Sequence, residues 1–117
     1  MPVRSSRSSV LRWPDRAEVM ASLAAWAETQ VQAGAKAVGC FGSYARGDQG
    51  VGSDLDLVIL VEESDLALVD RGARYDTLTL PVPVDLLVYT CAEWRQLVQE
   101  GRRITGEVRW LAWAGGG

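Results

Sequence analysis

The feature that most constrains the fold of this chain is an apolar run that opens with acidic residues. Leu55 to Val61 is aliphatic, with leucine and β-branched residues in equal number, except for Asp56 inside it, and Asp54 comes directly before it. Such a run predicts a buried strand. Because side chains alternate across a strand, Asp54 and Asp56 are expected to share one face, while Leu55 and Leu57 point to the other, into the core.

The acidic side chains predict a cation site. Two carboxylates about 4 Å apart repel by roughly 4 kcal/mol at an effective dielectric near 20, so a protein places a cation between them or protonates one. Asp85 stands near the start of another apolar run, Val84 to Tyr89, where a lone charge is costly unless it is paired or metal-bound. If the two strands are neighbours, all three carboxylates converge. The chain has no histidine, so a metal site would use carboxylates and take a hard cation such as magnesium.

A second segment predicts phosphate binding. Ala37 to Phe41 is a short apolar run typical of a strand, and it is followed by Gly42 and Ser43. Glycine lets backbone approach a ligand closely, and the free N–H groups of a helical turn beginning at Ser43 favour phosphate oxygens. Arg46 lies on the same helical face and is a candidate phosphate contact. A phosphate cradle that precedes a carboxylate pair indicates a nucleoside triphosphate with magnesium.

Each of these features has a plainer interpretation when it stands alone. A Gly-Ser pair after a strand is usually only a turn, and Asp-x-Asp is also typical of a solvated strand edge or a cap. Asp85 can equally lie at a strand edge that faces water, and Arg46 can be an ordinary surface residue. Tyr44 is expected on the helix surface. The combination is far more specific than any one part.

The remaining pattern predicts an α+β (or α/β-like) fold with a mixed sheet of three to five strands and helices on one side. Helical spacing of apolar residues indicates a helix over 16–33, capped by Asp15 and ended by Gly34. Its expected core face is Val19, Met20, Leu23, Ala24, Ala27 and Val31. The other expected elements are a short helix within 65–73, a helix over 91–99 capped by Thr90 and Glu93, and strands at 10–13 and 107–113.

Length and composition set the broader limits. The chain has 117 residues, which predicts one domain over 1–117, with a mobile Arg/Ser-rich start at 1–9 and a frayed glycine tail at 115–117. The arginines of the first sixteen residues, Arg16 among them, are expected in a solvated, partly frayed terminus. The net charge of −3 argues against a nucleic-acid substrate. The sequence has no apolar run of 18 residues, so no membrane-spanning helix is expected. Cys40 and Cys91 suit reduced thiols in a cytoplasmic protein.

The motif resembles the minimal nucleotidyltransferases of the DNA polymerase β superfamily. Their signature is Gly-Ser, ten residues, then Asp-x-Asp; here the ten residues are 44–53, and the third aspartate follows in Val84-Asp85-Leu86-Leu87. Ala45-Arg46-Gly47, Ser53 and Leu57 also match, and the resemblance covers residues 15 to about 99. It implies a polymerase-β-type fold, two magnesium ions and ATP as substrate. It also implies a site made of Asp54, Asp56 and Asp85 as catalytic metal ligands, with Gly42 and Ser43 on the triphosphate.

Within that superfamily the chain resembles the antitoxin subunits of two-component bacterial toxin–antitoxin systems. That resemblance implies transfer of AMP to a tyrosine of a partner HEPN ribonuclease toxin (AMPylation), with Asp85 activating the incoming hydroxyl. A small domain is expected to leave its active face open, with Tyr44 and residues 65–80 near the docked partner. Two alternatives remain: an aminoglycoside-type adenylyltransferase acting as a homodimer, and a protein that neutralises a toxin by binding alone. Trp13, Trp110 and Trp113 are expected in core or terminal packing.

Overall fold

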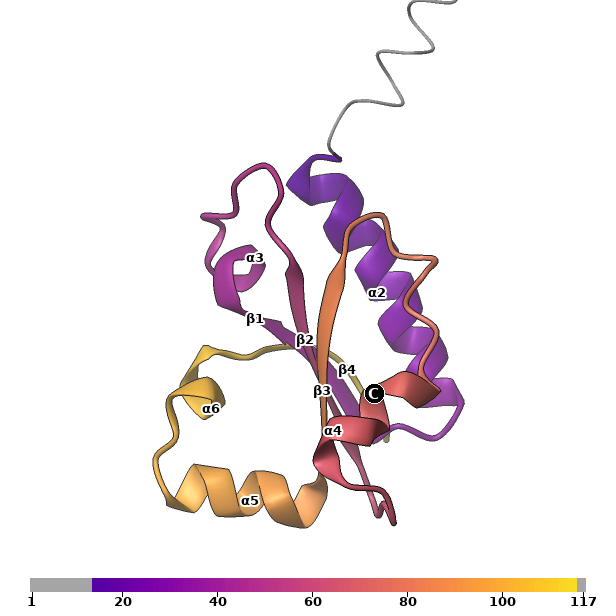
Figure 1. Ribbon diagram of the computed structural model, residues 1–117, viewed down its shortest axis with the longest axis vertical. Helices are drawn as coiled ribbons and strands as arrows, with labels where there is room; N and C mark the ends of the chain where they lie inside the picture. The colour runs from indigo at the N-terminus through magenta and orange to yellow at the C-terminus, as the bar shows by residue number, and fades with distance from the viewer. Residues whose placement is uncertain (1–13, 116–117) are drawn as a thin grey trace, which may run out of the picture.

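A four-stranded mixed sheet forms the centre of the computed structural model, which describes residues 14–115 (Figure 1). The predicted strand at 10–13, the arm at 1–9 and the last two glycines lie outside the described residues. The sheet order is β3-β2-β1-β4; β1 runs antiparallel to β2 and β4, and β2 runs parallel to β3. The strands are β1 (Ala37–Phe41), β2 (Leu55–Val61), β3 (Val84–Thr90) and β4 (Arg109–Trp113).

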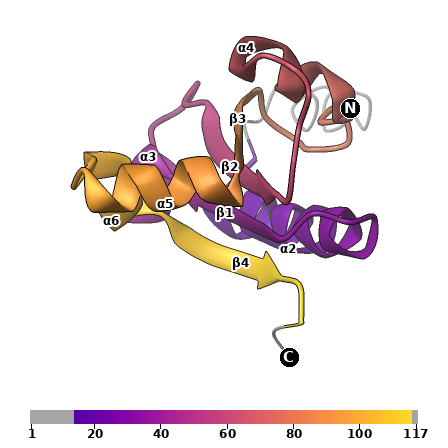
Figure 2. The same ribbon diagram turned by 90° about the horizontal axis from the view of Figure 1, so that it is seen from below.

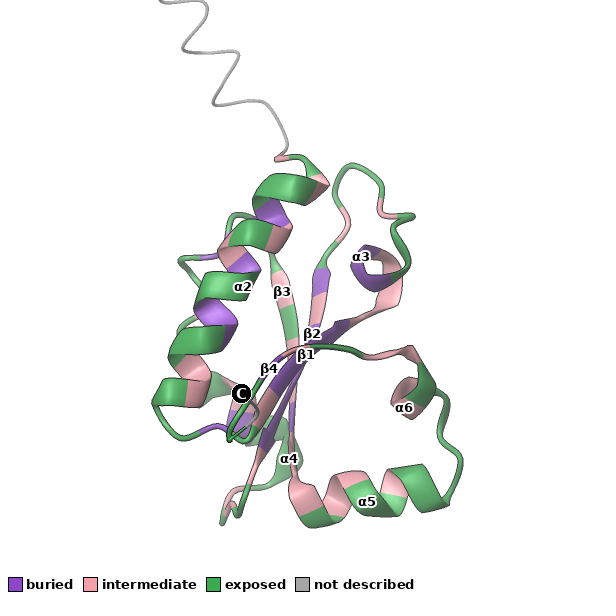
Figure 3. Ribbon diagram, turned by 180° about the vertical axis from the view of Figure 1, so that it is seen from behind, coloured by how far each residue is buried: buried purple, intermediate pink, exposed green. Residues whose placement is uncertain are grey.

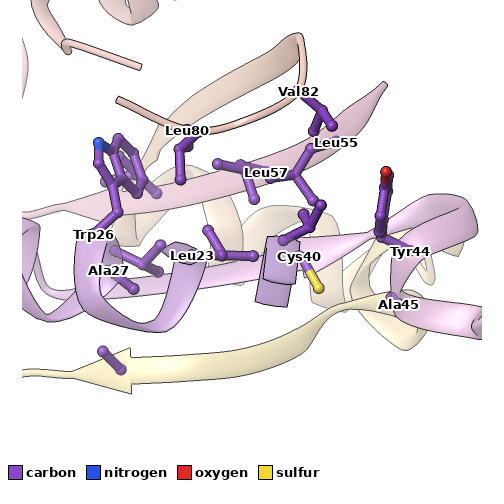
Figure 4. Close-up of a cluster of buried hydrophobic side chains, with 14 of the residues drawn as sticks. Leu23, Trp26, Ala27, Cys40, Tyr44, Ala45, Leu55, Leu57, Leu80 and Val82 are labelled. Carbon is purple, nitrogen blue, oxygen red and sulfur yellow. The ribbon is translucent and has the colours of Figure 1, made fainter. Parts of the chain in front are cut away.

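The longest helix covers one face of this sheet. Helix α2 (Arg16–Gln32) begins at Asp15, whose carboxylate accepts a hydrogen bond from the Glu18 N–H at 2.9 Å. Its buried residues contact Cys40, Leu55 and Leu57 in the main core (Figure 4). Those buried residues are Val19, Leu23, Trp26 and Ala27.

The predicted core face of α2 was wrong at two positions. Ala24 is exposed, whereas Trp26 is buried and its indole N–H donates to the carbonyl of Asp76 at 2.8 Å. The face that meets the sheet passes through Leu23, Trp26 and Ala27, three and four residues apart. The orientation of α2 about its own axis therefore buries the indole of Trp26 and leaves Ala24 facing solvent.

Helices α3 (Gly42–Arg46), α5 (Cys91–Gln99) and α6 (Arg103–Glu107) lie on the opposite face. Helix α4 (Leu68–Arg71) and the 3₁₀ turn η1 (Gly72–Arg74) lie on the same side as α2 (Figures 1 and 2). The expectation of helices on one side only was therefore wrong, because β2 is apolar on both faces: Val58 and Leu60 are buried opposite α2. The element at 65–73 is a short α4 that continues into a 3₁₀ turn, and α6 was not predicted.

Aromatic side chains attach α5 to the face of the sheet opposite α2, where Trp94 contacts one residue from each of the two outer strands, β3 and β4. The Trp94 ring lies 5.8 Å from Tyr89 and 5.5 Å from Trp110 between ring centroids. Trp110 and Trp113 keep 36% and 53% of their surface exposed, so of the two expected settings, core or terminal packing, Trp113 does not have the first. The exposed residues of α5 and β4 contrast with the buried centre of the sheet (Figure 3). Within residues 14–115, no helix is long and apolar enough to cross a membrane.

An ion pair joins α4 to the start of α5. Arg71 is 7% exposed and donates to both carboxylate oxygens of Glu93, at 2.6 and 3.1 Å, and to the carbonyls of Leu66 and Val88. Glu93 also completes the predicted capping box with Thr90. The hydrogen bond from Arg71, aided by those from Thr90, lowers the pKa of Glu93 from 4.5 to about 2.

We expect the Arg71–Glu93 pair to stabilise the fold above pH 4.5 and to be lost as pH falls toward 2. The folded-state pKa is depressed, so its contribution is present above the unfolded pKa and disappears through the folded one. Glu93→Gln should lower the free energy of unfolding by about 1 kcal/mol at pH 7, since the carboxylate is partly exposed. Urea unfolding from pH 7 to pH 2.5 should show this difference shrinking.

Glu28→Gln, at an exposed site on α2, is the matched control. A difference between wild type and Glu93→Gln that stays constant down to pH 2.5 would contradict this account of the pair.

Candidate active site

The predicted phosphate turn lies against the predicted carboxylate strand. Phe41, the last residue of β1, is the register partner of Asp56 on β2. Gly42 therefore emerges beside the Asp56 carboxylate, with φ at +73°. A Cβ atom at position 42 would collide with Oδ2 of Asp56. Glycine is required at position 42 for two reasons: the left-handed backbone conformation and the close approach of the backbone to the Asp56 carboxylate.

The parallel pairing of β2 and β3 brings the second carboxylate to the same place. Asp56 and Asp85 are register partners, so their side chains leave neighbouring strands on the same face. Burial raises the pKa of Asp56, and the charges of Asp85 and then Asp54 raise it further, while Arg46 opposes them. Asp54 and Asp85 are exposed, and Asp56 is half-buried. The three predicted carboxylates thus share one end of the sheet and one electrostatic environment.

The donor set fits a hard divalent cation. The acidic residues offer only oxygen ligands, and the raised pKa of Asp56 shows a concentration of negative charge that a cation would relieve. In residues 14–115, no group of three acidic, cysteine or histidine side chains is already gathered to hold a metal. The residues that would hold magnesium are thus brought to one end of the sheet without forming a closed ligand set, and their role as ligands stays a prediction.

Helix α3 orients the remaining predicted contacts. The carbonyl of Ser43 accepts hydrogen bonds from the N–H groups of Gly47 at 2.9 Å and Asp48 at 3.1 Å. Arg46 is exposed and its Nε lies 3.2 Å from Oδ2 of Asp48. Its charge acts on Asp56, which places Arg46 on the side of the carboxylates. Its contact with a phosphate stays a prediction.

Tyr44 does not lie where the sequence pattern placed it. The residue is 1% exposed and packs in the main core near Leu55 and Val82 (Figure 4). In this five-residue helix Tyr44 and Ala45 face inward while Arg46 faces solvent. Tyr44 therefore cannot form part of a docking surface, and the expectation that it would was wrong.

Arg16 belongs to the surroundings of the site, although it was expected in a frayed terminus. It is the first residue of α2, and its Nε and Nη2 both donate to the carbonyl of Tyr44, at 3.1 and 3.0 Å. The two residues are 28 positions apart. No local pattern signals a contact of this kind, so sequence reasoning had no means of finding it.

A mixed α+β sheet with a Gly-Ser turn against paired aspartates defines the class of nucleotidyl-transfer domains. The family model described as "Nucleotidyltransferase domain" matches residues 26–108, most of the chain, and the protein belongs to that family. No curated protein matches the chain. A solved structure from Sulfolobus solfataricus, described as a candidate nucleotidyltransferase, superposes with a TM-score of 0.64 at 19% identity, over 87% of this chain and 86% of the other. That likeness confirms the fold.

Gly42→Ala should disable ligand binding more than it disables folding. Alanine in a left-handed conformation costs roughly 1–2 kcal/mol, and the new Cβ displaces the Asp56 carboxylate, which is free to rotate away from the site. Gly101→Ala is the matched control, because its φ of +69° imposes the same backbone penalty with no atom within 4 Å of the new Cβ. Urea unfolding should show similar losses for both variants. Titration with Mg-ATP should show lost binding only for Gly42→Ala; equal binding by both would contradict the close approach.

Nucleotide and magnesium should bind in a coupled way that depends on the carboxylates. In calorimetric titrations with a non-hydrolysable ATP analogue, Asp54→Asn combined with Asp56→Asn should remove the magnesium dependence. The double variant should fold as stably as wild type, since it removes mutual repulsion. Asp65→Asn combined with Asp70→Asn, at two exposed positions away from the carboxylates, controls for the loss of two surface charges. Intact magnesium-dependent binding in the double variant would mean that the site is assigned to the wrong residues.

Proposed function

We propose that this protein is a magnesium-dependent adenylyltransferase that acts as an antitoxin, transferring AMP from ATP to a tyrosine of a partner HEPN ribonuclease. The observation that carries the proposal is the pairing of the Gly42–Ser43 turn with Asp56, and of Asp56 with Asp85 across parallel strands. In this proposal phosphate binds at the turn and metal binds at the carboxylates beside it. Membership of the nucleotidyltransferase family supports the reaction class.

The residues divide into two groups in this proposal. Ser43, the neighbouring backbone N–H groups and Arg46 hold the triphosphate. Asp54, Asp56 and Asp85 would hold magnesium, which when bound neutralises phosphate charge. The acceptor hydroxyl attacks the α-phosphorus, the bond to the β-phosphate oxygen breaks, and pyrophosphate leaves. Asp85 is exposed on the strand beside Asp56, where it can take the proton of the incoming hydroxyl.

Exposure around the site supports a macromolecular acceptor. Asp54 and Asp85 face solvent, so a large substrate can approach them. Leu60 lies four residues from Asp56 on the same strand and therefore on the same face of the sheet. It lines an open apolar groove together with Ala37, Trp94, Trp110 and Trp113. Exposed tryptophans are enriched at protein interfaces, and a partner that covers this groove would lie on the face that carries the carboxylates.

Co-expression with the helical protein encoded by the neighbouring gene tests the proposal. We expect the partner to co-purify and, by intact-mass spectrometry, to carry the mass of one or more AMP groups on a tyrosine. The Asp54→Asn, Asp56→Asn double variant should form the same complex without the added mass, because it loses the metal ligands and keeps the surface.

The two alternatives give different results in the same experiment. A complex whose partner stays unmodified with ATP and magnesium indicates neutralisation by binding alone. An unmodified partner alongside efficient labelling of an aminoglycoside would reject the proposal in favour of a small-molecule adenylyltransferase.

A further inference from the structure

We infer that Arg16 is a positioning residue for the phosphate turn: it holds α3 in place from outside the site, through the carbonyl of Tyr44. The effect of Arg16 on nucleotide binding rests on the proposed function. Its structural basis is the pair of hydrogen bonds from Nε and Nη2 of Arg16 to Tyr44 O, at 3.1 and 3.0 Å.

Helix α3 is too short to hold its own shape. It has five residues, and an isolated helix of that length is unstable in water. In an α-helix the carbonyl of Tyr44 would accept a hydrogen bond from the N–H of Asp48, four residues later. Here the Asp48 N–H donates to the carbonyl of Ser43 instead. The carbonyl of Tyr44 is therefore without its usual helical donor. Arg16 supplies a charged donor to that carbonyl.

Arg16 is itself firmly placed. It is the first residue of a 17-residue helix that is capped by Asp15 and anchored through the buried side chains of Val19 and Leu23. Its charge lies close enough to the end of β1 to oppose the rise in the pKa of Cys40 that burial causes. The guanidinium thus ties the rigid layer of α2 to the turn that begins at Gly42.

The geometry favours an indirect role. Two donors of the guanidinium converge on one backbone oxygen, and charge-assisted hydrogen bonds of this kind are strong and directional. A cation at the carboxyl end of a short helix also complements the partial negative charge there. The opposite end of the same helix is the Gly42–Ser43 turn proposed to face phosphate. Loss of Arg16 is therefore expected to loosen that turn without removing a group that touches the nucleotide.

Amide hydrogen exchange and nucleotide titration together test this role. Arg16→Met should accelerate exchange at the N–H groups of Gly47 and Asp48, which close α3, while the amides of Leu57 and Ile59 in the core keep their protection. It should weaken Mg-ATP binding by roughly tenfold, the effect of losing hydrogen bonds to a charged group. Arg16→Lys, which retains the charge without the planar fork, should fall between wild type and Arg16→Met. Arg95→Met, at an exposed arginine of α5, should change neither quantity.

The outcomes separate the inference from the proposed function. Weaker binding with unchanged exchange at Gly47 and Asp48 would mean that Arg16 contacts the nucleotide directly, which overturns a positioning role. Unchanged binding and exchange would overturn any role. A wild-type protein that binds no Mg-ATP would reject the proposed function, while the exchange measurement on the free protein would still decide whether Arg16 holds the turn. If Arg16→Met fails to fold, the Arg16→Lys comparison supplies the same readouts.

Discussion

The antiparallel pairing of β1 with β2 is the constraint on which the rest of the site depends. Its register sets Phe41 opposite Asp56, so the chain leaves β1 at the point where the carboxylate stands. Because successive side chains on β2 alternate, the same register buries Leu55 and Leu57 under α2. A slip of one residue would turn the carboxylates into the core and the leucines out. The apolar burial that stabilises the sheet therefore also fixes the position of the charges.

Charge repulsion at the end of the sheet is maintained by this packing. Asp56 is partly desolvated and faces two further carboxylates, which is why its pKa rises. The strands that carry Asp56 and Asp85 are held together by backbone pairing along their full length and by buried leucines and valines, so the two positions stay adjacent. A divalent cation bound between these carboxylates would relieve their repulsion.

The two sides of the sheet have different roles. On one side α2 supplies a continuous apolar layer, and at its first turn Arg16 reaches α3. On the other side the cover is thinner: Trp94 of α5 packs on Tyr89 and Trp110, and Trp113 is left largely exposed. The carboxylates open onto this second side. The dense apolar packing thus lies on the α2 side of the sheet, and the accessible surface lies on the side that carries the carboxylates.

Much of this protein could be predicted from sequence, because the signals are local. Strands β1 and β2 and helix α5 match their predicted bounds, since their apolar runs and the Thr90–Glu93 cap are contiguous in the chain. The resemblance to the family rests on the motif formed by Gly42-Ser43 and Asp54-x-Asp56, which is itself a local feature of the chain. Alternation along a strand was enough to separate the acidic face from the core face.

Only the tertiary structure decided the features that depend on distant parts of the chain. Four features arise between elements far apart in sequence. They are the inward orientation of Tyr44, the burial of Trp26 in place of Ala24, the helices on both faces of the sheet and the hydrogen bonds from Arg16 to Tyr44. Local patterns specify which residues are apolar and where the backbone can turn. They do not specify how an amphipathic element rotates against its neighbour, because that rotation is set by the shape of the surface it must cover.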